Sequence, residues 1–348
     1  MSNFTIELTN PIKQTNLDRL RSIAGTGPVL ILTHNNPDPD ALASGKALAT
    51  LFREAWGISG RLVYSGLVAR AENQAVLKYL TPEWEHSDVV LPDFKEYSAI
   101  AQVDTQPGAG NNRLNTVHPR HIVIDHHYPV RETLDTVTYS DIRTEMGSTV
   151  TMLFQYLVAA GIQPDPILAT AMFYGLKTDT RSLSRGASPA DEVTFLELLH
   201  NLDQQELSRV ELAGLSQEYF QSFSQGLQAT RVFGRVVVAR LGLITQPDFT
   251  AEMADTLIRL QDAHAALCLG QYGDTLHISL RTEPTGQQHA GKIIQQLIIS
   301  PGKAGGHGTM AGGQIPLQGK DIEPLFADIE HRFLTIMGET NVGEELIA

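Results

Sequence analysis

The stretch that indicates the fold is VLILTHNNPDPDALASGKALATLFREAW (residues 29–56). Its first five residues are an apolar run with the length and composition of a buried strand. A polar, acidic segment follows at residues 34–40, and the Ala/Leu-rich residues from Ala41 to Trp56 have helical spacing. A strand, a polar turn and a helix in this order begin a βαβ unit.

The alternation of strands and helices continues along the chain. Strands are predicted at residues 61–65, 99–103 and 122–124, and helices near 70–80, 148–160, 165–177 and 190–200. This order predicts an α/β fold with a mostly parallel sheet and helices on both faces. A second pattern begins near Val232, with strands at 235–240, 265–270 and 276–281 and helices near 251–261, 289–299 and 323–336. We expect an N-terminal domain at 1–190, a helical connector at 191–230, a smaller α/β domain at 231–348, and a cleft between the domains.

Composition narrows the class of protein. A length of 348 residues suits two domains, and 42% apolar residues suffice for two cores. The formal net charge of −13 argues against wrapping long duplex nucleic acid. Cys268 is the sole cysteine, which excludes an internal disulfide framework and a Cys-rich metal site. No apolar run is long enough for a membrane span and no signal peptide is visible, so we expect a soluble, cytoplasmic protein without membrane partners.

Carboxylates and imidazoles gather where the predicted strands end, which is where open α/β sheets place ligand sites. Each alone has a structural explanation, such as a helix N-cap or a turn. Together, four segments bring acids to one edge of one sheet, an arrangement that is unfavourable unless cations neutralise it. Oxygen-rich sites with imidazoles suit Mn²⁺, Mg²⁺ or Co²⁺, and there are enough ligands for two ions. The residues are His34, Asp38, Asp40, Asp104, Asp125, His126, His127 and Asp179. The pattern predicts a metal-dependent hydrolase.

A second candidate site is the glycine-rich run at residues 302–313, which contains Gly305, Gly306 and His307. Glycines permit positive φ, so consecutive N–H groups can converge on an anion. A hairpin is an equally good interpretation of the run, and the spacing is not that of a P-loop. Arg281 ends a predicted strand and could form a forked contact with a phosphate.

The ordered motifs H-x-x-x-D-x-D, D-T, D-H-H and T-D-T, followed by G-G-H, resemble the DHH–DHHA1 phosphoesterase superfamily. Within it the chain is similar to the nanoRNase/pAp-phosphatase (NrnA-like) branch, a relative of the RecJ exonucleases. The resemblance implies one metal ion held by His34, Asp38 and Asp104, and another held by Asp40, Asp104, His126 and Asp179. Asp104 would bridge the ions, Asp125 would orient His126, and His127 would face the scissile phosphate. Arg281, Gly305, Gly306 and His307 would bind the other end of the substrate.

By the same resemblance the protein is a phosphodiesterase, exonuclease (oligoribonuclease) or 3′,5′-bisphosphate nucleotidase. It would use two divalent ions, with Mn²⁺ favoured over Mg²⁺ or Co²⁺, for hydroxide attack on phosphorus. Its substrates would be short single-stranded oligonucleotides, dinucleotides or 3′-phosphoadenosine 5′-phosphate (pAp), and a homodimer is expected.

Three segments depart from the family pattern. Pro39 replaces a glycine of the first motif, and Ala304 replaces the first glycine of G-G-G-H. Residues 181–186 (RSLSRG) replace the usual aromatic-containing stretch. Pro39 stiffens the loop of the first motif without removing a predicted metal ligand, and the other two departures concern the substrate side of the predicted site.

Three alternatives stay open. A manganese-dependent inorganic pyrophosphatase has a related D-H-H core, although its C-terminal domain differs. A cyclic dinucleotide phosphodiesterase cannot be separated from a nanoRNase by the motifs. A catalytically inactive nucleotide-binding regulator belongs to another class, and the completeness of the predicted ligand set argues against it. Processive degradation of long strands is disfavoured, because the chain is short, acidic and lacks an added strand-gripping domain.

Overall fold

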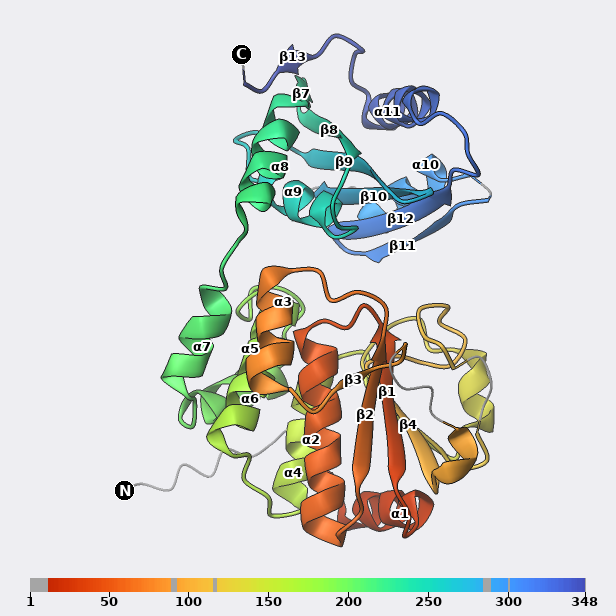
Figure 1. Ribbon diagram of the computed structural model, residues 1–348, viewed down its shortest axis with the longest axis vertical. Coiled ribbons are helices and arrows are strands. Elements are labelled where there is room, and N and C mark those ends of the chain that lie inside the picture. Colours follow the sequence, from red (N-terminus) through yellow and green to blue (C-terminus); the bar gives the residue numbers. More distant parts are fainter. Residues whose placement is uncertain (1–11, 89–92, 115–117, 284–288, 300, 348) are drawn as a thin grey trace. The chain divides into compact units, whose positions relative to one another are not determined.

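The computed structural model describes residues 12–88, 93–114, 118–283, 289–299 and 301–347. The chain divides into two compact units, Met1–Ala213 and Gly214–Ala348 (Figure 1). The division falls within residues 191–230, where the sequence predicts a connector. None of the described helices has both the length and the apolar character needed to cross a membrane.

The first unit is built on a six-stranded sheet in the order β3-β2-β1-β4-β5-β6. All five strand pairs are parallel, which confirms the predicted mostly parallel sheet. The strands are β1 (Val29–Asn35), β2 (Gly60–Ser65), β3 (Glu85–His86), β4 (Ala99–Val103), β5 (His121–Asp125) and β6 (Tyr139–Ile142).

The helices described in this unit are α1 (Gln14–Ala24), α2 (Pro39–Trp56), α3 (Ala71–Ala75), α4 (Thr149–Ala159), α5 (Pro166–Asp179), α6 (Pro189–Leu199) and α7 (Gln204–Glu211). A π-helical turn at Val76–Leu80 extends α3, and short 3-10 turns lie at Phe94–Glu96 and Glu132–Thr136. Successive side chains of a strand point to opposite faces. Accordingly Val29 and Ile31 pack into the large helical core, whereas Leu30 packs with Ile100 and Tyr97 in a smaller cluster.

The second unit has a seven-stranded sheet in the order β11-β12-β10-β9-β8-β7-β13. Only the β8–β9 pair is parallel among the described strands. Its elements are α8 (Gln217–Gln228), β7 (Thr230–Phe233), β8 (Val236–Leu243), α9 (Phe249–Leu257), β9 (Ala265–Tyr272), β10 (Thr275–Thr282), α10 (Ala290–Leu297), β11 (Lys303–His307), β12 (Met310–Pro316), α11 (Glu323–Met337) and β13 (Glu344–Glu345).

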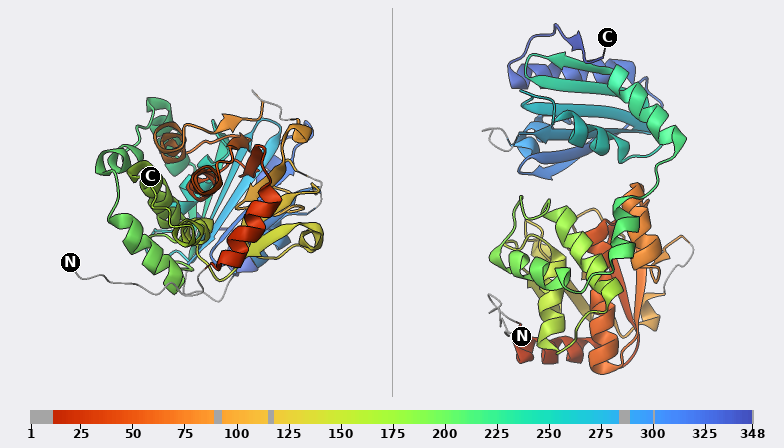
Figure 2. Two further views of the ribbon diagram at one scale, coloured as in Figure 1. Left: turned by 90° about the horizontal axis from the view of Figure 1, so that it is seen from below. Right: turned by 90° about the vertical axis from the view of Figure 1, so that its left-hand side faces the viewer.

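Helices cover both faces of this second sheet (Figure 1, Figure 2). Val236 and Val238 pack toward the core that contains residues of α10 and α11, and Val237 packs toward the core that contains residues of α9. The alternation along β8 therefore builds two cores from one strand.

The glycine-rich run forms a hairpin, which is one of the two interpretations that the sequence left open. Gly305 pairs with Gly312 and Gly306 with Ala311 in the antiparallel β11–β12 ladder. Within residues 301–313, Gly308 alone has a φ in the left-handed region, at 53°, and it lies in the turn. Consecutive N–H groups of an extended, paired strand alternate in direction, so the run does not form a nest for an anion.

Candidate metal centre and active site

The parallel sheet determines which predicted residues meet. Strands β1, β4 and β5 are neighbours, and their carboxyl ends carry His34, Asp104 and the segment 125–127. Asp38 caps α2 by accepting a hydrogen bond from Ala41 N at 3.0 Å, and the first turn of that helix contains Asp40. The last residue of α5 is Asp179. Side chains from five elements thus converge at one edge of the sheet.

One group of possible metal ligands consists of His34, Asp38 and Asp104. His34 Nε2 lies 3.4 Å from Asp104 Oδ2 and 3.8 Å from Asp38 Oδ1. The other nitrogen of the ring, Nδ1, lies 2.9 Å from the carbonyl oxygen of Asn35. That carbonyl accepts a hydrogen bond from Nδ1, which leaves Nε2 to face the two carboxylates.

A second group consists of Asp40, His126 and Asp179. His126 Nε2 lies 3.3 Å from Asp179 Oδ2, 3.9 Å from Asp40 Oδ2 and 3.5 Å from Asp104 Oδ1. His126 Nδ1 hydrogen-bonds the carbonyl oxygen of Met146 at 3.0 Å. As in the first group, a backbone carbonyl orients the ring so that Nε2 points toward the acids.

Asp104 connects the two groups. Its Oδ2 faces His34 while its Oδ1 faces His126, and the residue is 1% exposed. Asp104 Oδ2 and His126 Nε2 are buried without a hydrogen-bond partner among the described residues. Buried polar atoms are normally satisfied, so these two point to a missing ligand. A divalent cation fits both atoms and the carboxylates around them.

The charges of the cluster support the same conclusion. Burial, reinforced by Asp104 and Asp179, raises the pKa of Asp40 well above its ordinary value. Burial also raises the pKa of Asp179, with Asp38 and Asp104 adding to it. Burial opposes charge on His126, yet the carboxylates of Asp179 and Asp104 raise the pKa of this imidazole well above its usual range. The site thus holds more negative charge than it can neutralise, which is the environment that a divalent cation stabilises.

The N-terminus of α4 supports two of the acids, and the sequence did not predict this. Thr149 N and Val150 N donate to the two carboxylate oxygens of Asp40, at 2.8 and 2.9 Å. The Thr149 hydroxyl donates to Asp104 Oδ1 at 2.8 Å. A helix N-terminus favours a carboxylate, so α4 fixes Asp40 while leaving further lone pairs on its oxygens. The feature of the sequence that could have indicated this support is the start of a predicted helix near residue 148.

His127 lies beside the cluster and is more exposed. Its Nδ1 lies 2.9 Å from Asp125 Oδ1 and 3.5 Å from Asp104 Oδ1, and 45% of its side chain is exposed. Asp125 is fully buried, and burial alone would raise its pKa. The pKa is nevertheless lowered, because the hydrogen bond and charge of His127, the hydrogen bond from Gln106 and the charge of His126 together outweigh burial. The carboxylate of Asp125 therefore orients His127; His126 is oriented by a backbone carbonyl instead. Asp104, His126 and His127 also form a third group with metal-binding spacing.

A second residue that the sequence did not predict is Gln106. Its side chain is buried, and Nε2 donates to Asp125 Oδ2 at 2.7 Å and to the carbonyl oxygen of His127 at 2.9 Å. Gln106 thereby holds both members of the Asp125–His127 pair. A neutral amide carries no charge pattern that sequence reasoning could have used.

The candidates in the second unit have different surroundings. Arg281 Nε donates to Asp255 Oδ1 at 2.6 Å, and Nη1 donates to the carbonyl oxygen of Leu280 at 3.1 Å. The residue is 8% exposed. Gly305, Gly306 and His307 belong to β11, whose partner β12 also pairs with the strand that contains Arg281. These candidates share one sheet, and the guanidinium already has a carboxylate partner.

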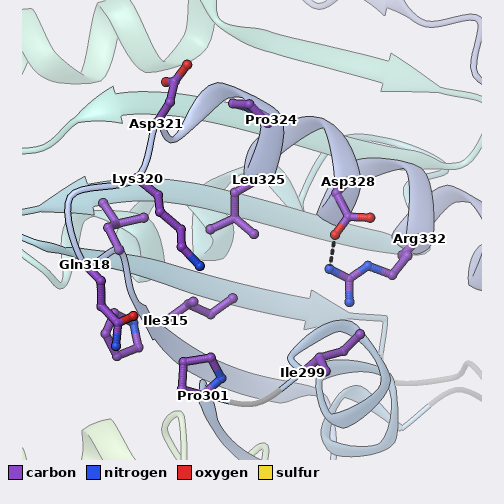
Figure 3. A pocket seen from close by; sticks show the side chains of 12 residues that line it. Ile299, Pro301, Ile315, Gln318, Lys320, Asp321, Pro324, Leu325, Asp328 and Arg332 are labelled. Atoms are coloured by element: carbon purple, nitrogen blue, oxygen red, sulfur yellow. Dashed lines mark hydrogen bonds and ion pairs between the residues drawn. The ribbon is translucent and has the colours of Figure 1, made fainter.

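The second unit also has a hollow of about 450 Å³ beside α11 (Figure 3). Ile315, Leu325 and Ile299 are among its apolar lining residues, and Arg332 is paired with Asp328 at its edge. The hollow contains none of the residues predicted from the sequence. We assign it no part in the site at the carboxyl edge of the first sheet.

Comparison with protein families gives two matches. Residues 28–176 match the DHH family, N-terminal domain, and residues 233–333 match the DHHA1 domain. Together the matches contain every site residue predicted from the sequence except Asp179, which lies just beyond the first.

Curated proteins include two informative relatives. An uncharacterized protein of Methanocaldococcus jannaschii is 34% identical over 292 residues, which cover 83% of this chain and 58% of that protein. A probable manganese-dependent inorganic pyrophosphatase of Streptococcus agalactiae is 27% identical over 185 residues, covering 50% of this chain and 55% of the relative. The chain thus spans just over half the length of these relatives.

Solved structures share the fold. An exopolyphosphatase-related protein from Bacteroides fragilis superposes with a TM-score of 0.75 at 17% identity, covering 95% of this chain and 99% of that one. RecJ from Thermus thermophilus in complex with Mn²⁺ gives a TM-score of 0.57 at 13% identity, covering 97% and 56%. At these identities the similarity concerns the fold alone.

Proposed function

Since this chain belongs to the DHH–DHHA1 superfamily, with a DHH domain followed by a DHHA1 domain, we propose that it is a metal-dependent phosphoesterase. The observation that carries the proposal is the pair of ligand groups connected by the buried Asp104, whose two carboxylate oxygens face His34 and His126. One group would hold an ion through His34, Asp38 and Asp104. The other would hold an ion through Asp40, Asp104, His126 and Asp179.

Two divalent ions at this site would polarise phosphoryl oxygens and activate water for in-line displacement at phosphorus. The protein's own groups prepare the site for this chemistry. Gln106 and Asp125 hold the imidazole of His127 at the exposed edge of the cluster, where it can hydrogen-bond a phosphate oxygen. Because this ring is fixed before substrate arrives, little reorganisation is needed in the transition state.

We propose short oligonucleotides, dinucleotides and pAp as the substrates, with Mn²⁺ as the preferred metal. The acidic chain supports a small substrate, because long strands are held by many Lys and Arg contacts to phosphates. The DHHA1 domain supports a nucleotide, with Arg281 and the β11–β12 hairpin as its proposed contacts. Arg281 would have to share its guanidinium between Asp255 and the substrate.

Inorganic pyrophosphate is the second candidate substrate. It is favoured by the 27% identity to a probable manganese-dependent inorganic pyrophosphatase over half of this chain. Both candidate reactions hydrolyse a phosphorus–oxygen bond, so the metal cluster does not separate them.

The test is a substrate panel measured with Mn²⁺ and again with EDTA. It contains pAp, the dinucleotide pApA, a 5-mer, a 24-mer, cyclic di-AMP and pyrophosphate. We expect Mn²⁺-dependent cleavage of pAp or of the 2–5-mers, with little activity on the 24-mer. Rapid turnover of pyrophosphate with idle nucleotides would make the protein a pyrophosphatase. No turnover of any substrate by folded, metal-loaded protein would contradict a phosphoesterase function.

A further inference from the structure

The loop that follows the histidine pair carries two exposed apolar side chains. Tyr128 is 80% exposed and Val130 is 53% exposed, although both lie next to the candidate active site. Exposing a large aromatic ring has no benefit for folding, since burying it would be favourable. An exposed aromatic ring beside a site offers a flat apolar face to a ligand.

The base of this loop is held firmly, so the exposure is built into the structure. Gln106 Nε2 donates to the carbonyl oxygen of His127 at 2.9 Å, and Gln106 Oε1 accepts from Arg131 N at 2.8 Å. One buried amide therefore closes the loop at both ends. Gln106 is itself fixed, because its backbone carbonyl oxygen accepts a hydrogen bond from Asn112 Nδ2 at 2.8 Å. A side chain displayed on a fixed loop loses little further freedom when it contacts a ligand.

The same amide connects the loop to the chemistry of the site. Gln106 also donates to Asp125 Oδ2 at 2.7 Å, and Asp125 Oδ1 is the partner of His127 Nδ1. Tyr128 directly follows His127, and consecutive Cα atoms lie about 3.8 Å apart. The exposed Tyr128 ring is thus anchored on the residue next to the imidazole proposed to contact the phosphate.

We propose that Tyr128 is a specificity-determining residue whose ring stacks on the base of the nucleotide whose phosphate contacts His127. The inference rests on the proposed function and extends it, because it explains how the site would prefer a nucleotide over a bare phosphoester. Base–aromatic stacking contributes about 1–3 kcal/mol per base and tolerates any base, since every base has a flat face. Tyr128 would thus select for the presence of a base without selecting its identity.

The test compares two substrates that differ only in the bases, pApA and its abasic analogue, in the presence of Mn²⁺. The measured quantity is the ratio of kcat/KM for pApA to kcat/KM for the abasic analogue. Tyr128→Ala should lower this ratio about tenfold, which corresponds to the loss of about 1.4 kcal/mol. Tyr128→Leu, which keeps apolar bulk without an aromatic face, should lower it to a similar extent. Tyr128→Phe should keep the wild-type ratio, because the ring and not the hydroxyl makes the contact.

A matched control is Phe94→Ala, which removes another partly exposed aromatic ring of the same unit. Phe94 precedes the amino end of β4, whereas the site lies at the carboxyl ends of the strands. This variant should keep the wild-type ratio. Thermal unfolding of each variant confirms that it is folded.

Three results would overturn the inference. The first is a folded Tyr128→Ala variant whose kcat/KM ratio equals that of the wild type. The second is a Tyr128→Phe variant whose kcat/KM ratio falls as far as that of Tyr128→Ala. In both cases the wild-type enzyme still cleaves pApA, so the proposed function stands. The third is a wild-type protein that cleaves neither substrate while retaining Mn²⁺, which removes the proposed function and this inference with it.

Discussion

The candidate site residues of the two units differ in how far hydrogen bonds and ion pairs satisfy them. In the first, Asp104 and His126 are buried with polar atoms that have no hydrogen-bond partner among the described residues. In the second, the buried Arg281 is paired with Asp255. An unsatisfied buried cluster is unstable unless a ligand completes it, whereas a satisfied pair already contributes to the fold. The comparison indicates that the cluster in the first unit is suited to a divalent cation, and that Arg281 has a structural role in addition to any contact with substrate.

The largest effect should come from the residue shared by both ligand groups. Asp104→Asn keeps the size of the side chain but removes its charge, so we expect kcat to fall on the order of 10³-fold or more for every substrate. The measurement is initial rate at saturating Mn²⁺. Asp93→Asn, which changes an exposed acid of the same unit, is the control and should behave like the wild type. If Asp104→Asn turned over substrate at the wild-type rate, the cluster in the first unit would have only a structural role.

A smaller effect is expected from the hydroxyl that supports Asp104. Thr149→Val removes the hydrogen bond to Asp104 Oδ1 and keeps the two backbone contacts to Asp40. Loss of such an outer contact usually weakens metal affinity or activity about 10–100-fold. Titration calorimetry with Mn²⁺ measures the affinity directly. Thr149→Ser should have the wild-type affinity for Mn²⁺. Equal Mn²⁺ affinities of Thr149→Val and the wild type would show that the hydroxyl is dispensable.

The charge of the cluster predicts how the metal-free protein responds to pH. The pKa of His126 and that of His34 are raised by their carboxylate neighbours, against the effect of burial. A folded-state pKa above the unfolded value gives stability that is complete below about pH 6.5 and is lost as pH rises toward the folded pKa. The Tm of EDTA-treated protein should therefore fall as pH increases from about 6.5.

Mn²⁺ should reverse this trend, because metal ligands must be deprotonated to bind. Melting curves recorded with EDTA and with Mn²⁺ at several pH values provide the check. Parallel curves under the two conditions would contradict a metal-binding role for these histidines.

The smallest catalytic effect should come from the second unit. Arg281→Ala removes the ion pair with Asp255, whose side chain is 31% exposed, so we expect a Tm lower by a few degrees. If the guanidinium also contacts substrate, the KM for pApA should rise severalfold while kcat changes less. Asp255→Asn is the matched variant, since it breaks the ion pair and keeps Arg281. An unchanged KM in Arg281→Ala would restrict this residue to a structural role.

The sequence predicted the parallel sheet and the position of the acids because both follow from short-range patterns. An apolar run followed by a polar turn locates a strand end, and adjacent parallel strands bring their ends together. His34 and Asp104 were therefore expected at one edge of the sheet, and His34 Nε2 lies 3.4 Å from Asp104 Oδ2. The membership of the superfamily was likewise readable from the order of the motifs.

What escaped prediction depends on contacts between distant segments. Thr149 and Gln106 are neutral, and the residues adjacent to them in the sequence give no indication that either one hydrogen-bonds an acid of the site. The partner of Arg281 lies on α9, 26 positions earlier in the chain, and no periodicity connects the two residues. The glycine-rich run was ambiguous because glycine is unfavourable in strands, yet here Gly306 fits where a side chain would contact the Ala311 backbone.

The most direct test of the metal centre is anomalous diffraction at the manganese edge from crystals soaked in Mn²⁺. We predict two peaks on either side of Asp104, one contacted by His34 and Asp38, the other by Asp40, His126 and Asp179. Two such peaks would establish the shared carboxylate on which the proposed chemistry depends. A single peak that Asp104 does not contact, or no peak at this edge of the sheet, would contradict the account.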